Sequence, residues 1–339
     1  MRLWKAVCAA GALLAATVVV AAAQADTSIR FSLDSRIDGT AAPFFLAIDR
    51  GYFRHEKLNV TVEPAATRRE PLTRVASGDY ALGFVDINAL IKFREANPDM
   101  PVKAVFIVYN RPPYAVVGRK SRGIAVPKDL EGRRLGAPTD DITYAQWPLF
   151  AKAAAIDSTR VKVENIGAPV RVPMLAAGQV DALTGFSFTT ALDLKDRGVP
   201  ANDITVMDMA DYGLALYGNA IIVNTQFAAG EPDAVRGFLR AFLRGLKDTV
   251  KSPGNAIDSV IRRADGAQRP LELERLTMMV RDNIITPEVR AQGFGGFDAG
   301  RFEKALEQLT SIHKFKMPPK TDAIFDQSFL PSARERRFQ

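Results

Sequence analysis

The strongest constraint on the fold is that short strand-like segments alternate with helix-like segments, and that this alternation occurs twice. Residues 27–110 contain apolar segments with strand character, separated by amphipathic segments with helical spacing. Residues 131–186 repeat the pattern. Strands that alternate with helices form mostly parallel sheets covered by helices. We therefore predict an α/β protein with two such domains.

Single segments carry this pattern clearly. The segment "LNVTVEPA" places Leu58, Val60 and Val62 on one face, as in a half-buried strand. The segment "VKAVFIVYN" (102–110) is continuously apolar, which is typical of a strand covered on both faces. Pro148 interrupts the helical segment 139–156 and predicts a kink or a second helix start there.

The two sets of segments also resemble each other locally. "PLTRVASGDYALGF" (71–84) and "PMLAAGQVDALTGF" (173–186) each begin a short helix at proline, stop it at glycine and continue into a strand. Any helix-to-strand corner selects such residues, so one interpretation is purely local. The other is a pair of pseudo-equivalent domains that face one another.

Long helices are predicted beyond residue 204. In the segment 231–252 an apolar stripe follows helical spacing, and we expect it to form core and not a partner surface. The stripe consists of Val235, Phe238, Leu239, Phe242 and Leu246.

The first 25 residues have the composition of a secretory signal peptide. Arg2 and Lys5 precede an apolar run, and "AQA" ends at Ala25, where we predict cleavage. The alternative is a single membrane anchor, for which the run is short. The only cysteine, Cys8, lies in this leader, so the mature chain would have no disulfide and no thiol nucleophile.

Charge and motifs exclude several classes of function. Removal of the leader leaves 43 basic against 38 acidic residues, spread along the chain, which indicates solubility and not a nucleic-acid surface. His55 and His313 are the only histidines, and both are predicted at the surface, so a Ser-His-Asp triad is not expected. Metal-protease, phosphate-loop and dinucleotide motifs are missing from the sequence. We expect neither an enzyme nor a bound cofactor or metal.

Four segments, in order, resemble a known family. They are "FFLAIDRGYFRHEKLNVTV", "RVASGDYALGFVDINALI", "VPKDLEGRRLGAPTDDITY" leading into "LAAGQVDALTGF", and "GNAIIVNTQFAAGEPDAVRGFLRAFLRGL". The chain is similar to the periplasmic substrate-binding proteins of ABC importers of the nitrate, sulfonate, taurine and thiamin-pyrimidine (NMT1/THI5-like) type. The resemblance implies a type II periplasmic binding protein, with two α/β lobes, mostly parallel sheets and two crossovers at a hinge.

The resemblance also implies a domain plan and partners. After the signal peptide (1–25), lobe 1 would comprise residues 26–109 and 219–339, and lobe 2 residues 110–218. The crossovers would be "YNRPPYAVV" and "YGLALYGNA". The protein would be a periplasmic monomer that binds a small-molecule solute and docks on the transmembrane subunits of an ABC permease, with no nucleic-acid partner.

A ligand in an open α/β sheet lies beyond the carboxyl ends of the strands. This rule selects loop residues from both predicted lobes. The candidate ligand-binding residues are Arg36, Asp38, Thr40, Phe44, Thr67, Arg68, Phe84, Asp86, Tyr109, Arg111, Asp140, Tyr144, Arg171, Phe186, Tyr212, Tyr217 and Asn219.

The candidates favour a small aromatic or heteroaromatic ligand over a small anion. Asp140 and Asp141 at a helix start, with Asp38 and Asp86, lower the local potential, although one of the first two is also expected as a helix cap. The aromatic candidates suit a flat ring, for example an aminopyrimidine. Alternatives are nitrate, an alkanesulfonate, taurine or an anionic aromatic held by arginine. A THI5-like pyrimidine-synthesis enzyme is a further alternative, disfavoured by the leader and the lack of cysteine.

Overall fold

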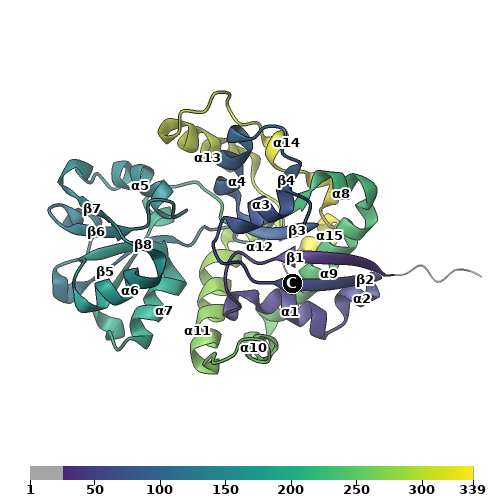
Figure 1. Cartoon of the computed structure of the whole chain (residues 1–339), viewed down its shortest axis with the longest axis horizontal. Helices are drawn as coiled ribbons and strands as arrows, with labels where there is room; N and C mark the ends of the chain where they lie inside the picture. The colour runs from purple at the N-terminus through teal and green to yellow at the C-terminus, as the bar shows by residue number, and fades with distance from the viewer. Residues whose placement is uncertain (1–25, 339) are drawn as a thin grey trace, which may run out of the picture.

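The computed structural model describes residues 26–338. Two five-stranded sheets form the centres of two lobes, which lie side by side (Figure 1). The lobe 1 sheet has the order β2-β1-β3-β10-β4 and the lobe 2 sheet the order β7-β6-β8-β5-β9. The strands are β1 (Thr27–Ser32), β2 (Leu58–Glu63), β3 (Leu82–Asp86), β4 (Val102–Ile107), β5 (Tyr114–Arg119), β6 (Arg134–Ala137), β7 (Lys162–Asn165), β8 (Ala182–Phe186), β9 (Ile204–Asp208) and β10 (Asn219–Asn224).

Four strands of each sheet run in one direction and one runs against them. In lobe 1 the reversed strand is β10, which pairs antiparallel with β3 and β4. In lobe 2 it is β5, which pairs antiparallel with β8 and β9. The predicted mostly parallel α/β sheets are therefore confirmed. The crossover "YNRPPYAVV" was assigned too long, because β5 already begins at Tyr114 after the two prolines.

The two sheets are built alike, which supports the interpretation of pseudo-equivalent domains. In each, the strand order follows the same sequence of crossovers, and the reversed strand lies in the fourth position. The two similar corners occupy matching places, before β3 and before β8. Gly78 and Gly178 both have the left-handed backbone that glycine adopts readily, with φ of +85° and +73°.

Helices cover both sheets. Those that precede β10 are α1 (Ala42–Asp49), α2 (Tyr52–His55), α3 (Glu70–Ala76), α4 (Ile87–Ala96), α5 (Trp147–Ala153), α6 (Ala168–Ala177) and α7 (Ser187–Asp196). Those that follow β10 are α8 (Thr225–Gly230), α9 (Pro232–Lys251), α10 (Pro253–Ile261), α11 (Arg269–Met279), α12 (Pro287–Gln292), α13 (Ala299–Ile312), α14 (Thr321–Ile324) and α15 (Ala333–Arg336).

Single turns complete the fold. The 3₁₀ turns are η1 (Gly39–Ala41), η2 (Lys120–Arg122), η3 (Pro127–Leu130), η4 (Tyr144–Gln146), η5 (Ser158–Arg160), η6 (Ala201–Asp203), η7 (Met209–Tyr212) and η9 (Gln327–Phe329), and a π-turn, η8 (Val280–Ile284), extends α11. Pro148 lies in the first turn of α5, directly after η4, so the second helix start is confirmed.

The chain passes between the lobes twice, and the two crossovers are hydrogen-bonded to each other. The amide of Tyr109 donates to the carbonyl of Asn219 at 2.9 Å, and the amide of Gly218 donates to the carbonyl of Tyr109 at 2.9 Å. A Cβ on Gly218 would lie 2.9 Å from the Cβ of Tyr109. Only glycine allows this close approach.

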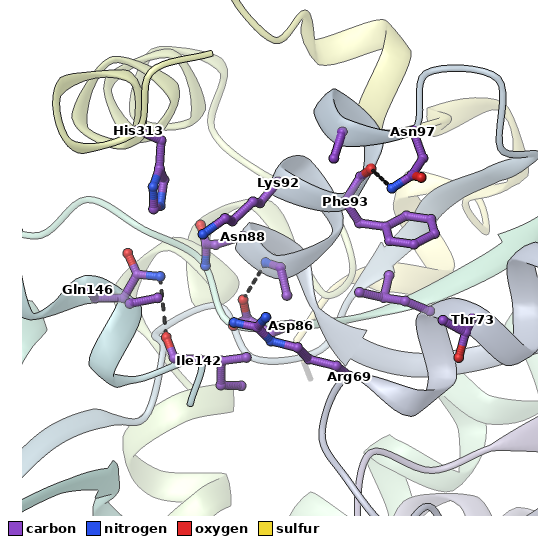
Figure 2. Close-up of a pocket in the computed structure, with 14 residues that line it drawn as sticks. Arg69, Thr73, Asp86, Asn88, Lys92, Phe93, Asn97, Ile142, Gln146 and His313 are labelled. Atoms are coloured by element: carbon purple, nitrogen blue, oxygen red, sulfur yellow. Dashed lines mark hydrogen bonds between the residues drawn. The ribbon is translucent and has the colours of Figure 1, made fainter. Parts of the chain in front are cut away.

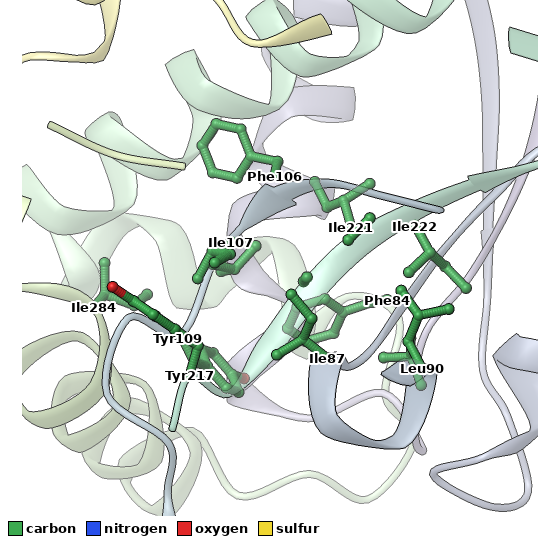
Figure 3. Close-up of a cluster of buried hydrophobic side chains, with 14 of the residues drawn as sticks. Phe84, Ile87, Leu90, Phe106, Ile107, Tyr109, Tyr217, Ile221, Ile222 and Ile284 are labelled. Atoms are coloured by element: carbon green, nitrogen blue, oxygen red, sulfur yellow. The ribbon is translucent and has the colours of Figure 1, made fainter. Parts of the chain in front are cut away.

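The core of lobe 1 lies between its sheet and α9. The predicted apolar stripe of α9 is fully buried, as expected. Phe242 stacks on Phe44 with 4.6 Å between ring centroids and meets Phe106 edge-on. Figure 3 shows the part of this core around β10, where Phe84, Tyr109 and Tyr217 pack among aliphatic side chains.

The predicted signal peptide, residues 1–25, lies outside the described residues. Within residues 26–338, no helix combines the length and the apolar character needed to cross a bilayer.

Candidate functional site

A cavity of about 590 Å³ lies between the lobes. Lobe 1 contributes the loops that follow β1 and β2, and lobe 2 the loops that follow β6 and β7 together with α7. The cavity therefore occupies the place that the carboxyl-end rule selects in α/β sheets. The predicted site residues that line it are Arg36, Asp38, Thr67, Arg68, Asp140 and Arg171.

Arg68 connects the two lobes inside this cavity. Its Nη1 donates to Asp34 at 2.6 Å, and its guanidinium lies 3.9 Å from the ring centroid of Phe186 in lobe 2. Asp34 also accepts a hydrogen bond from the amide side chain of Asn219 at 2.9 Å. Burial raises the pKa of the Asp34 carboxyl above its usual range, against the attraction of Arg68. Asp34 begins the loop 34–40 that the carboxyl-end rule selects, although it was not among the individual residues chosen as candidates.

Two of the predicted carboxylates act as caps. Asp38 accepts hydrogen bonds from the amide and hydroxyl of Thr40 and so caps η1. Asp141 accepts from the amides of Thr143 and Tyr144, which confirms a cap at this corner. Asp141 also pairs with Arg171 at 3.2 Å. Asp38, Asp140 and Asp141 all line the cavity.

A buried arginine behind the cavity wall was missed by the sequence analysis. Arg275 of α11 has no exposed side-chain surface and pairs with Glu272 and with Asp193 of α7. Glu272 accepts a hydrogen bond from the amide of Gly39 at 2.7 Å. Asp193 also lies 3.8 Å from Arg36. The network thus joins α7 of lobe 2 to the loop that carries Asp38.

Most of the predicted aromatic residues lie in the core. Phe44, Phe84, Tyr109, Phe186 and Tyr217 are all buried, and no aromatic residue in the described part of the chain lines the 590 Å³ cavity. The rings of Phe84, Tyr109, Phe188 and Phe186 form a run of edge contacts from lobe 1 into lobe 2. Their contact with a ligand stays a prediction.

The remaining candidates lie near the crossovers or farther along the lobe boundary. Arg111 pairs with Asp208 and Asp211 and lines a separate cavity of about 270 Å³. The ring of Tyr212 packs edge-on against Phe150, and the hydroxyl of Tyr217 donates to Glu288. Arg111, Tyr212 and Tyr217 therefore lie apart from the large cavity.

The boundary between the lobes continues into a second cavity of about 310 Å³ (Figure 2). It lies between α4 of lobe 1 and η4 of lobe 2, and His313 at the end of α13 completes its wall. A third cavity of about 350 Å³ contains the predicted residues Asp140 and Tyr144. Arg69 lines all three cavities, so they adjoin at this side chain.

Asp86 and Tyr114 form a buried contact between the lobes beside the second cavity. Asp86 caps α4 by accepting from the amide of Ala89, and it also accepts the hydroxyl proton of Tyr114 at the start of β5. Asn88 donates to the oxygen of the same tyrosine at 2.7 Å. Burial raises the pKa of Asp86 to about 6, although its hydrogen bonds oppose the shift.

Within the described residues, histidine, cysteine and carboxylate side chains nowhere form a group of three that could hold a metal ion.

The sequence profile of the family described as "NMT1/THI5 like" matches residues 39–256, more than half of the chain. The chain belongs to the NMT1/THI5-like family. The matched range includes every lobe 2 strand and the loops that line the large cavity, except for the lining residues 34–38 after β1.

Two binding proteins are among the similar members of known function. The riboflavin-binding protein RibY of Chloroflexus aurantiacus is 25% identical over 86% of this chain and 82% of its own length. The formylaminopyrimidine-binding protein of Halalkalibacterium halodurans is 25% identical over 92% of this chain and 96% of its own length. Synthases of 4-amino-5-hydroxymethyl-2-methylpyrimidine phosphate match over a smaller part, 62–68% of this chain.

Solved structures share the fold. The periplasmic aliphatic sulphonate binding protein SsuA of Escherichia coli superposes with a TM-score of 0.68 at 13% identity, over 92% of each chain. The predicted periplasmic-binding-protein fold is thereby confirmed.

Proposed function

We propose that this protein is a periplasmic receptor of an ABC importer, which binds one small heteroaromatic solute between its lobes and delivers it to a membrane permease. The observation that carries the proposal is the 590 Å³ cavity, lined by both lobes at the carboxyl ends of their strands. Its size falls within the roughly 300–1,000 Å³ of pockets for small organic molecules. The names of the two binding-protein relatives support a heteroaromatic solute.

The charges of the cavity support an uncharged ring over a small anion. Arg36, Arg68 and Arg171 each lie beside an aspartate, at 3.8, 2.6 and 3.2 Å respectively. Among the arginines that line the cavity, only Arg69 forms no ion pair within the described residues, so most of the positive charge is compensated. The carboxylates of the lining can accept hydrogen bonds from ring amino and N–H groups. A receptor for nitrate, taurine or an alkanesulfonate is the weaker candidate for this reason.

Closure follows from the shared lining. Because the solute contacts both lobes only when they are together, its binding shifts the molecule toward the closed form by its differential affinity for that form. Lobe 1 (26–109 and 219–339) and lobe 2 (110–218) would move as units about the crossovers. The receptor would act as a monomer, exported through cleavage after Ala25, and intact mass measurement of the exported chain checks that it begins at Asp26.

A thermal-shift screen tests the receptor function and its ligand class. The solutes are pyrimidines, riboflavin, aromatic carboxylates, alkanesulfonates, taurine and nitrate. A ligand at 100 times its Kd adds about 2.7 kcal/mol to the free energy of unfolding. Stabilisation by nitrate or taurine alone would contradict the heteroaromatic class. Chemical turnover of a bound solute would contradict the receptor function and favour the pyrimidine-synthesis enzyme.

A further inference from the structure

The second and third cavities differ in charge from the large one. Arg69 and Lys92 line both of them. Neither side chain forms an ion pair or hydrogen bond with another side chain among residues 26–338. Arg69 also lines the large cavity, where the other three arginines are paired, so Lys92 is the cation that distinguishes the two smaller cavities. Asp140 lines the third cavity, and Asp86, already hydrogen-bonded to Tyr114, lines the second.

Three elements direct polar side chains into the second cavity. Figure 2 shows Lys92 of α4, Gln146 of η4 and His313 at the end of α13 pointing toward one another. Lys92 and His313 are close enough to interact electrostatically. Burial lowers the pKa of His313, and the positive charge of Lys92 lowers it further. The cavity is thus a convergence of donors from both lobes and from the C-terminal helices.

Gln146 provides an independent sign of a missing partner. It is only 3% exposed, and its Oε1 has no hydrogen-bond partner. Its Nε2 reaches the carbonyl of Ile142 at 3.4 Å, a long contact. A buried polar atom without a partner costs free energy, which a ligand that supplies a donor would recover. A hydroxyl group next to an anionic group satisfies both Gln146 and the two cations.

We propose that the second cavity, with Arg69, Lys92, Gln146 and His313 in its wall, is a subsite for a hydroxylated, anionic tail of the solute. Phosphate is the anion that fits this subsite. The proposal rests on the proposed function, since the ring of the same solute would occupy the large cavity. Arg69 connects the two parts, because it lines both. The free cations attract the anion, and the lobes enclose it only when they are together.

The test compares each neutral solute with its phosphate ester by isothermal titration calorimetry at constant ionic strength. The probes are riboflavin and riboflavin 5′-phosphate, 4-amino-5-hydroxymethyl-2-methylpyrimidine and its phosphate, and inorganic phosphate alone. The proteins are the wild type, the double variant Arg69→Gln/Lys92→Gln and the control Lys304→Gln. Lys304 is an exposed lysine of α13 and lines none of these cavities.

We expect the ester of one pair to bind about 10- to 100-fold more tightly than its alcohol in the wild type and in Lys304→Gln, as charge-assisted hydrogen bonds suggest. In the double variant this ratio falls toward one, because the affinity for the ester falls much further than the affinity for the alcohol. If inorganic phosphate binds as tightly as the ester, and this binding is lost in the double variant, the second cavity is a site for a free anion. Much weaker phosphate binding assigns it to the tail of the solute.

Three results overturn the subsite. Equal affinities for alcohol and ester in the wild type would contradict the subsite. They would leave the receptor function intact, because the alcohol still binds. A preference for the ester that survives in the double variant places the anion elsewhere. Failure of every probe to bind overturns both the heteroaromatic solute class and the subsite. The substitutions lie at exposed side chains, so an unchanged circular dichroism melting curve verifies that the variants are folded.

Discussion

At the scale of single residues, buried carboxylates hold the boundary between the lobes. Asp34 is compensated by Arg68, a full positive charge at 2.6 Å. Asp86 has no such cation and relies on neutral donors, chiefly Tyr114 and the amide of Ala89. Removing a carboxylate from water without a counter-charge favours its protonated form, and this explains why the pKa of Asp86 rises to about 6.

The raised pKa of Asp86 predicts a pH dependence of stability. Its ordinary pKa is 3.8, so between about pH 4 and pH 6 the folded protein retains a proton that the unfolded chain has released. The stabilising contribution of this proton is complete below pH 4 and is lost as the pH rises through 6. Two pKa units correspond to about 3 kcal/mol.

Asp86→Asn removes this contribution and keeps a residue that caps helices well. Denaturant unfolding at pH 4, 5, 6 and 7 should show that the wild type loses about 3 kcal/mol more than the variant over this range. The other buried aspartates with raised pKa values, Asp34 and Asp208, are present in both proteins and cancel in the difference. If the free energies of unfolding of the wild type and the variant change with pH in parallel, Asp86 is ionised in the folded protein over the whole range from pH 4 to pH 7.

At the scale of elements, α11 is the helix that joins the lobes behind the cavity. In Figure 1 it lies between them, and it packs against α7 of lobe 2 and against η1 of lobe 1. Two ion pairs connect α11 to α7. One is the buried pair of Arg275 and Asp193, and the other is the exposed pair of Glu274 and Lys195.

These two pairs provide a matched experiment. Arg275→Met leaves Glu272 without its counter-charge in the interior and leaves Asp193 with only Arg36 at 3.8 Å. We expect a loss of about 3–5 kcal/mol in the free energy of unfolding. Lys195→Met breaks the exposed pair between the same helices and should cost less than about 1 kcal/mol. Denaturant titrations measure both. If both variants lose a similar free energy of unfolding, burial does not make the Arg275 pairs stronger than the exposed pair.

The elements also show which parts of the fold could be predicted from the sequence. Helix α9 and the corners at Gly78 and Gly178 were predictable, because apolar spacing and glycine stops are local signals. Strand β5 was missed, since the prolines before it concealed its start. The role of Arg275 could not be predicted, because a charged residue in a helix is usually solvated and its partners here lie on other elements.

The candidate site was predicted in part for the same reason. The loops after β1 and β2 were located correctly at the cavity, since strand direction fixes where they lie. The aromatic residues near loop ends were placed at the cavity by their position alone, yet Phe44 of α1 and Phe84 of β3 pack inward. In strands covered on both faces, the apolar pattern does not distinguish a ring that faces a cleft from one that faces the core.

At the scale of the whole molecule, the two crossovers connect the lobes and lie against each other. The crossovers contact each other at Gly218, where a Cβ would lie 2.9 Å from Tyr109 Cβ and 3.1 Å from Pro112 Cα. Tyr109 also continues the aromatic contacts from Phe84 to Phe188 across the lobes. The spacing of the crossovers therefore fixes how the walls of the cavity meet.

Gly218→Ala tests this junction against Gly254→Ala in α10, where an added Cβ would meet no atom within 4 Å. The first variant must separate two backbone segments, and we expect it to lose about 1–3 kcal/mol in the free energy of unfolding. The second should be neutral or up to about 1 kcal/mol more stable, because alanine favours the helix. Because the crossovers carry both lobes, Gly218→Ala should also weaken binding of the solute found by the thermal-shift screen, whereas Gly254→Ala should not. Unchanged stability and affinity in Gly218→Ala would mean that the crossovers can move apart without disturbing the cavity, and the lobes would then be oriented by α11 and its buried arginine instead.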